Sequence, residues 1–103
     1  MDKEQAIELA KKYADIIKSY FNIKKVVLYG SYACGKQTSD SDIDVAVIVD
    51  KIDGNILDVE AKLYKLRRNL DLRIEPILLD EKEDISGFKD EVLKTGIIVY
   101  HND

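Results

Sequence analysis

The feature that most constrains the fold of this chain is a nearly continuous apolar run at Ile43–Val49, with the sequence IDVAVIV. The run has the length of a strand, and because it is apolar at almost every position, we expect it to be buried on both faces of a sheet. A second run, 25–29, is shorter, rich in β-branched residues and closed by Gly30. The sequence therefore predicts two buried strands separated by a polar loop.

Three amphipathic stretches predict helices. Asp2 caps the first, with Gln5 three residues later in a capping-box arrangement. The second follows a turn signal at 53–55, and the third is ended by Gly96. The predicted helices cover 2 to about 21, 56–70 and 86–95.

Two further stretches predict strands, at 71–79 and 97–100. Pro76 lacks a ladder donor, which favours an edge position or a bulge for the first of these. The order helix, strand, loop, strand, helix, strand, helix, strand predicts an α/β (α+β) fold, with a small mixed β-sheet packed with helices. Residues 1–103 are expected to form a single domain, because the length suits one modest core.

Composition excludes several functional classes. The 103 residues contain 16 Lys and Arg against 20 Asp and Glu, which argues against a general nucleic-acid binder. No apolar run approaches the roughly 20 residues of a membrane span, and residues 1–4 precede no apolar signal core. The single Cys34 cannot form an internal disulfide, so we expect a reducing, cytoplasmic setting.

Charge is unevenly distributed along the chain. Seven acidic residues lie between 37 and 60 against one lysine, whereas 61–70 carries four basic residues and no acidic one. The basic residues either form a solvated helix face or dock an acidic partner. They are Lys62, Lys65, Arg67 and Arg68.

The loop between the two buried strands holds the candidate chemistry. Asp42 and Asp44 are two residues apart at the start of a strand, so their side chains share one face while Ile43 points into the core. Two like charges held that close favour a cation, and all-oxygen ligands favour Mg²⁺ or Mn²⁺. Gly30 allows close approach to a phosphate, and Ser31 adds a hydroxyl and an amide where a short helical turn begins.

Two other interpretations of this loop fit poorly. The stretch 30–36 spells most of a P-loop, but Gln37 replaces the Ser or Thr that holds magnesium, and no long helix follows. The stretch 40–44 matches the first ligands of an EF-hand, but Val45 stands where that loop needs glycine.

The order Gly30-Ser31, ten further residues, then Asp42-x-Asp44 followed by 45–47 (VAV) resembles the signature of the minimal nucleotidyltransferase (MNT) family. This family lies within the polymerase-β-like nucleotidyltransferase superfamily, and the similarity extends over nearly the whole chain. The resemblance implies that fold, with MntA-type antitoxins among the similar proteins.

The resemblance also implies a third carboxylate on the strand after the second helix. Glu75 and Asp71 are both candidates; Glu75 lies 21 residues before Gly96 and Asp71 lies 25, which favours Glu75 while leaving Asp71 open. Many relatives carry a basic residue where this chain has Cys34, so Lys36 is the candidate for steadying a triphosphate.

The implied activity is transfer of a nucleoside monophosphate, AMP from ATP or its equivalent from another triphosphate, to a hydroxyl. Asp42, Asp44 and Glu75 would hold two Mg²⁺ ions, and Gly30, Ser31 and Lys36 would bind phosphate. A tyrosine of a helical HEPN-domain partner is the expected acceptor, in a toxin–antitoxin system. A catalytically inactive binding module that neutralises a partner is the alternative. Base preference and association into a homo-oligomer are left open.

Overall fold

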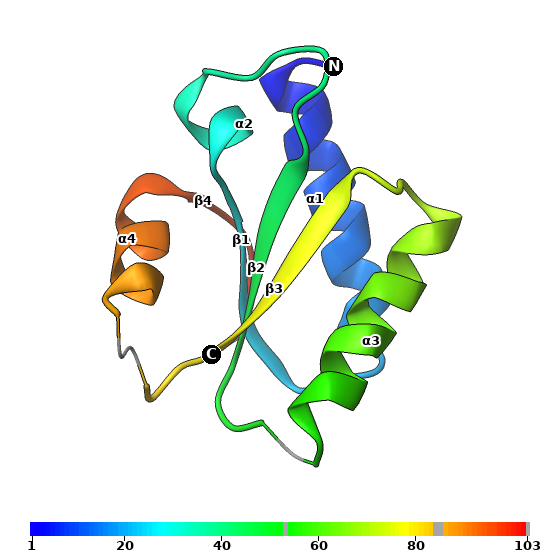
Figure 1. Ribbon diagram of the computed structural model, residues 1–103, viewed down its shortest axis with the longest axis vertical. Helices are drawn as coiled ribbons and strands as arrows, with labels where there is room; N and C mark the ends of the chain where they lie inside the picture. The colour runs from blue at the N-terminus through cyan, green and yellow to red at the C-terminus, as the bar shows by residue number, and fades with distance from the viewer. Residues whose placement is uncertain (53, 84–85, 103) are drawn as a thin grey trace.

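A computed structural model describes residues 1–52, 54–83 and 86–102, so the predicted turn residue Asp53 lies outside the described part. Helices and strands alternate around one four-stranded sheet (Figure 1). In chain order the elements are α1 (Lys3–Ile17), β1 (Ile23–Tyr29), α2 (Ser31–Cys34), β2 (Ile43–Val49), α3 (Ile56–Leu66), the 3-10 helix η1 (Arg67–Asn69), β3 (Ile74–Asp80), α4 (Phe88–Thr95) and β4 (Ile97–His101).

The sheet is mixed, as predicted, with the strand order β3-β2-β1-β4. β1 runs antiparallel to β2 and β4, whereas β2 and β3 are parallel. The central strand β2 has the bounds predicted from its apolar run. Pro76 lies on β3, an edge strand, which confirms the edge position inferred from its missing amide donor.

Helices cover both faces of the sheet (Figure 1). α1 and α3 pack on one face, where Ile43, Val45 and Val47 of β2 join the larger buried cluster with the apolar side of α1. The buried hydroxyl of Tyr13 in α1 donates to the Leu63 carbonyl at 2.7 Å and ties α1 to α3. α4 covers part of the opposite face through a smaller buried cluster, made of Val27, Ala46, Ile48 and Val92.

Helix termini follow the predictions with small shifts. The predicted capping box forms, since Asp2 Oδ1 accepts from the Gln5 amide at 2.8 Å and Gln5 Oε1 accepts from the Asp2 amide at 2.9 Å. α1 ends at Ile17, four residues earlier than expected, and turns cover the next residues. None of the helices in the described ranges is both long enough and apolar enough to cross a bilayer.

The predicted end of α4 at Gly96 is confirmed, but its physical reason is different. Gly96 is extended, with φ −88°, so no left-handed cap requires glycine there. A Cβ at this position would press on the Val27 side chain and on the backbone oxygens of Val92 and Leu28. Glycine is therefore needed for the close approach of the α4–β4 connection to β1.

Candidate functional site

The candidate carboxylates lie at one end of the sheet, where β2 begins. Asp42 is exposed just before the strand, and the half-buried Asp44 pairs in register with Tyr29 of β1 and Glu75 of β3. The side chain of Asp44 lies on the face that carries Ala46 and Ile48, opposite to the side chains of the larger cluster. Three adjacent strands thus bring Tyr29, Asp44 and Glu75 together in one row.

The electrostatics of this row show an excess of negative charge. The pKa of Asp44 is raised first by burial and then by the negative charges of Asp42 and Glu75. Burial, with a smaller contribution from Asp44, raises the pKa of Tyr29 to about 12. The Tyr29 ring meets the Phe88 ring edge to face, with centroids 5.7 Å apart, which places the start of α4 beside the row.

Gly30 lies directly over Asp44. Its φ of +76° is in the left-handed region, and a Cβ on it would overlap Asp44 Oδ2. Ser31 follows as the first residue of the four-residue helix α2, which packs through the buried Tyr32. Gly30 therefore lies against Asp44, and both its positive φ and this contact favour glycine at the position.

Glu75 is held from the side of α3. Tyr64 Oη donates to Glu75 Oε2 at 3.0 Å, and Arg67 Nη1 lies 3.8 Å from Glu75 Oε1. The Arg67 guanidinium also lies 4.7 Å from the centroid of the Tyr64 ring and donates to the carbonyls of Leu72 and Ile74 at 2.8 Å each. The sequence analysis missed Tyr64, because only the packing of α3 beside the edge strand β3 brings it to Glu75.

The alternative third carboxylate, Asp71, is occupied elsewhere. It precedes β3, which begins at Ile74 rather than at 71 as expected, and its Oδ1 accepts from the Arg73 amide at 2.9 Å. The Arg73 guanidinium donates to both of its oxygens, and these bonds hold the pKa of Asp71 below its usual range. Of the two candidates, the register therefore brings Glu75 beside Asp44.

The remaining candidates lie on the surface. Lys36 follows α2 in an exposed loop, with no ion pair to the residues that the structure describes. Cys34 is exposed, and its thiol approaches the Ser31 carbonyl at 3.6 Å. The four basic residues predicted on the second helix lie on α3 and η1, and they do not form one solvated face. Lys62 lies 4.7 Å from the centroid of the Tyr20 ring, and Arg67 contacts Glu75.

The donor set suits a hard divalent cation. Asp42, Asp44 and Glu75 offer only carboxylate oxygens. The pKa of Asp44 is raised by burial first and then by the charges of Asp42 and Glu75, and a bound cation would relieve this repulsion. Within residues 1–52, 54–83 and 86–102, no three acidic, His or Cys side chains are already grouped as metal ligands. The carboxylate oxygens are thus ligands of the kind that a divalent cation prefers, but they are not grouped around one point, and Glu75 contacts Tyr64 and Arg67.

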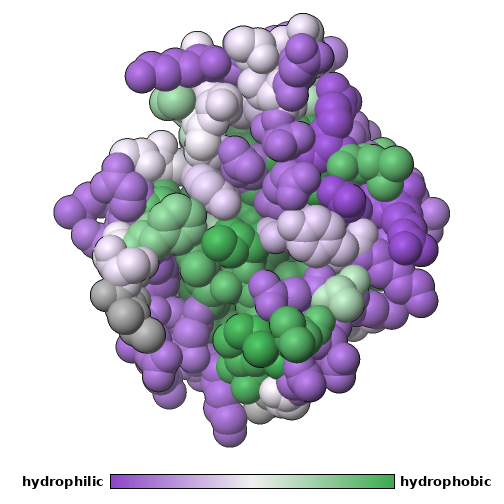
Figure 2. All heavy atoms as spheres, viewed as in Figure 1, coloured by the Kyte–Doolittle hydropathy of each residue, from purple (hydrophilic) through white to green (hydrophobic). Residues whose placement is uncertain are grey.

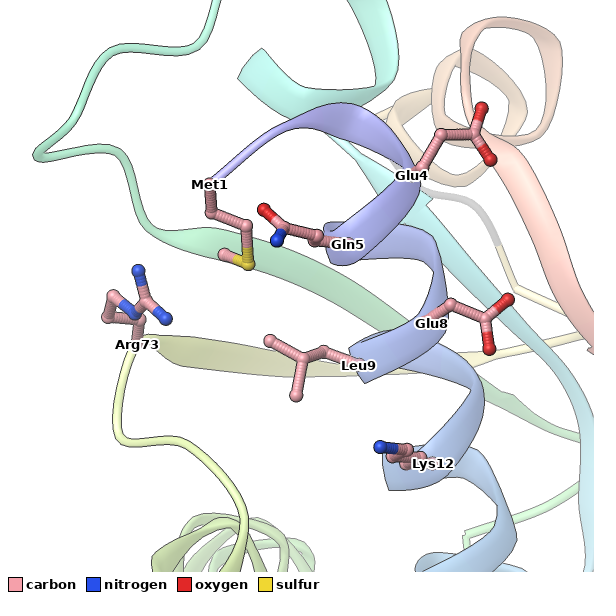
Figure 3. Close-up of a pocket in the computed structure, with 7 residues that line it drawn as sticks. All are labelled: Met1, Glu4, Gln5, Glu8, Leu9, Lys12 and Arg73. Carbon is pink, nitrogen blue, oxygen red and sulfur yellow. The ribbon is translucent and has the colours of Figure 1, made fainter.

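Two surface hollows differ in their relation to the carboxylates. A hollow of about 480 Å³ lies between the start of α1 and Arg73; Figure 3 shows Met1, Leu9 and Arg73 facing one another across it, with no candidate site residue among its lining. A second, of about 390 Å³, lies between β3 and α4 and is lined by Ile77, Leu79 and Phe88. It forms the apolar depression at the centre of Figure 2, on the face that carries Glu75.

Comparison with known proteins identifies the family of this chain. Residues 11–103 match the family described as "Polymerase beta, Nucleotidyltransferase". A Methanocaldococcus jannaschii protein, provisionally named a protein adenylyltransferase, is 33% identical over 103 residues, which cover 97% of this chain and 100% of that protein.

Solved structures share the fold. A protein of Sulfolobus solfataricus, provisionally described as a nucleotidyltransferase, has a TM-score of 0.73 and 27% identity, covering 97% of this chain and 84% of that one. A chain from a complex of a tri-AMPylated Shewanella oneidensis HEPN toxin with an MNT antitoxin has a TM-score of 0.63 and 20% identity, covering 97% and 73%. The chain described here therefore belongs to the polymerase beta nucleotidyltransferase family of enzymes.

Proposed function

We propose that this nucleotidyltransferase transfers AMP from ATP to a hydroxyl group in a Mg²⁺-dependent reaction. The observation that carries the proposal is the row formed by Asp44 and Glu75 in register on parallel strands, with Asp42 two residues before Asp44 and Gly30 directly over it. A glycine with positive φ, whose added Cβ would clash with a half-buried carboxylate, is typical of a site where backbone and substrate approach closely.

Each of the three carboxylates has a role in this proposal. Asp42 and Asp44 would hold Mg²⁺, together with Glu75 for a second ion. When bound, Mg²⁺ supplies neutralisation of the triphosphate and of the developing negative charge. Glu75 accepts the proton of the attacking hydroxyl, and the departing pyrophosphate is met by the Gly30 and Ser31 amides and by Lys36.

The proposed acceptor is a tyrosine of a HEPN-type partner, with this chain as the antitoxin. The Shewanella complex described above contains an AMPylated HEPN toxin and an MNT antitoxin, and the M. jannaschii relative is named for protein adenylylation. The apolar hollow between β3 and α4 supports a protein acceptor, because it opens on the same face as Glu75 and includes Phe88, which is 37% exposed.

A second candidate function is binding without catalysis. In this case the chain would neutralise its partner as a module whose transfer site is inactive. The favouring observation is that Glu75 is bound by Tyr64 and lies near Arg67, which compete with any role of Glu75 as a ligand or base.

Replacement of Asp44 tests the proposal. With ATP labelled at the α-phosphate, Mg²⁺ and a HEPN-type partner, we expect the wild-type chain to transfer label to the partner. Asp44→Asn should reduce the rate by at least about 10²-fold, the scale for removing one electrostatic group from an active site. Asp50→Asn is the matched control, because Asp50 lies just beyond the other end of β2 and pairs with Lys82 at 3.6 Å.

The two candidate functions give different results in this assay. A partner that gains adenylate units, with Asp44→Asn inactive and Asp50→Asn active, supports the transferase. A stable complex with no gain in partner mass supports the binding module. An unchanged rate in Asp44→Asn would overturn the role given to the row.

A further inference from the structure

A tyrosine hydroxyl of this chain already contacts Glu75, the residue proposed as the base of the transfer reaction. Tyr64 is 39% exposed, and its Oη donates to Glu75 Oε2 at 3.0 Å. Tyr64 also lies close enough to Tyr29 for its charge to affect the Tyr29 pKa, as do the charges of Asp44 and Glu75. The hydroxyl thus lies at the Glu75 end of the carboxylate row.

A general base must contact the hydroxyl that it deprotonates, within about 2.6–3.2 Å. Tyr64 Oη meets this condition toward Glu75, the base of the proposed function. The geometry points to Tyr64 as an internal acceptor: the chain adenylylates its own Tyr64 when ATP is bound and no partner hydroxyl has displaced it. This inference rests on the proposed function and adds a modification site on α3.

The step is balanced by groups already named. The Tyr64 oxygen forms a bond to the α-phosphorus of ATP, and the bond from that phosphorus to the oxygen bridging to the β-phosphate breaks. Pyrophosphate leaves, and the Tyr64 proton passes to Glu75 and then to water. The product is an adenylyl-tyrosine phosphodiester on α3, with no change of oxidation state.

The surroundings of Tyr64 suit this role better than those of Tyr13, Tyr20 and Tyr32. Arg67 lies 4.7 Å from the centroid of the Tyr64 ring, so it restrains the ring and offers positive charge to a phosphodiester formed there. Tyr13 and Tyr32 are fully buried. Tyr20 is 55% exposed but lies after α1, with Lys62 over its ring, and has no hydrogen bond to a carboxylate among the described residues.

Intact-mass measurement of the full chain with Mg²⁺ and ATP tests the inference, followed by peptide mapping. A small phenol, N-acetyltyrosinamide, is included in a parallel reaction as an external acceptor. We expect the wild-type chain to gain one adenylate unit on Tyr64. Tyr64→Phe should lose this gain and label more of the external phenol, since the competing hydroxyl is absent. Tyr20→Phe is an equally conservative change of an exposed tyrosine, and this variant should gain one adenylate unit on Tyr64 as the wild type does.

A mixing experiment separates transfer within one chain from transfer between chains. Asp44→Asn, which keeps Tyr64 but lacks activity, is combined with Tyr64→Phe, which keeps the carboxylate row but lacks the acceptor. Because the hydrogen bond joins Tyr64 and Glu75 of one chain, neither variant should be labelled. Label on Tyr64 of the Asp44→Asn chain would overturn the intramolecular reaction.

The remaining outcomes distinguish this inference from the proposed function. If the wild type labels the phenol and not itself, or labels Tyr29 in place of Tyr64, the inference is wrong and the transferase proposal stands. If neither the chain nor the phenol is labelled, and the partner assay also shows no transfer, both are wrong.

Discussion

The two faces of the sheet are built from the same strands but differ in role: one packs the core, and the other carries the candidate site. On the face covered by α1 and α3, fully buried apolar residues of every strand except β4 form one large cluster. On the α4 face, the described residues contribute only four members to the buried cluster, and the row with Asp44 and Glu75 lies beyond it toward the start of β2. One face is therefore closed by packing, while the other is left open at the end where the charged groups lie.

Strand β2 shows how the difference arises. Its side chains alternate, so Ile43, Val45 and Val47 enter the larger cluster while Asp44 and Ala46 face α4. A single strand thus anchors the fold with one set of residues and presents the site with the other. The rigidity of the closed face fixes the position of Asp44 on the open one, which suits a site that needs accurate placement.

The largest effect on stability should come from the closed face. Ile17 in α1 is fully buried, so Ile17→Ala should lower the free energy of unfolding by about 2–5 kcal/mol through lost burial and the resulting cavity. Urea denaturation measures the loss. Transfer per folded molecule should be unchanged, because Ile17 lies on the face opposite the row; a selective loss of activity would break the division between the faces.

Replacement of Glu75 tests whether the carboxylates on the α4 face carry the transfer activity. Glu75→Gln removes the proposed base and one of the charges that raise the pKa of Asp44, and should lower the transfer rate by about 10²-fold. Its stability should change little, because the amide oxygen of the new side chain can still accept from Tyr64 and the lost ion pair with Arg67 is long, at 3.8 Å, and partly exposed. Glu8→Gln, an exposed change on α1, is the control for removal of one negative charge, and should leave the rate unaltered. Equal rates for the two variants would contradict the role of Glu75.

Two glycines with positive φ compare backbone strain alone with strain plus contact with the site. Gly35 is in the left-handed helical region, with φ +75° and ψ +18°, so alanine there should cost about 1–2 kcal/mol in stability. Gly30 has φ +76° but ψ −147°, a region that favours glycine more strongly, so alanine should cost more there. A new Cβ at Gly30 would meet Asp44 Oδ2, whereas a new Cβ at Gly35 would meet no other residue of the described ranges within 4 Å. Gly30→Ala should therefore lower both stability and transfer, and Gly35→Ala mainly stability. Similar transfer rates in the two variants would show that the contact with Asp44 is dispensable.

The sequence predicted the closed face better than the open one. Apolar runs and a capping box depend on neighbouring residues, so β2 and the start of α1 were predicted at their observed positions. The shared face of Asp42 and Asp44 could also be predicted, because strand alternation is a local property. The Tyr64–Glu75 hydrogen bond could not be predicted, because it depends on how α3 packs beside β3. The start of β3 was missed because Asp71 bonds to Arg73, a local alternative to the sheet.

The smallest effect on transfer is expected for Asp71, and its replacement tests which of the two candidates is the third carboxylate. Asp71→Asn removes the pair with Arg73, whose Nη2 lies 2.7 Å from Asp71 Oδ2, and should leave transfer unchanged. Because Arg73 lowers the pKa of Asp71 in the folded state, the pair stabilises the protein above the unfolded pKa of about 3.9, and this stability is lost as pH falls through the lower folded value.

The pH dependence of unfolding therefore provides the measurement. The urea midpoint of Asp71→Asn should be slightly below that of the wild type at pH 7, and the two midpoints should converge as the pH falls below the unfolded pKa of Asp71 and through its lowered folded pKa. A transfer defect as large as that of Glu75→Gln would instead assign Asp71 to the site. In that case the hydrogen bonds from Arg73 would have to open during the reaction, and the register of Asp44 with Glu75 would no longer identify the third carboxylate.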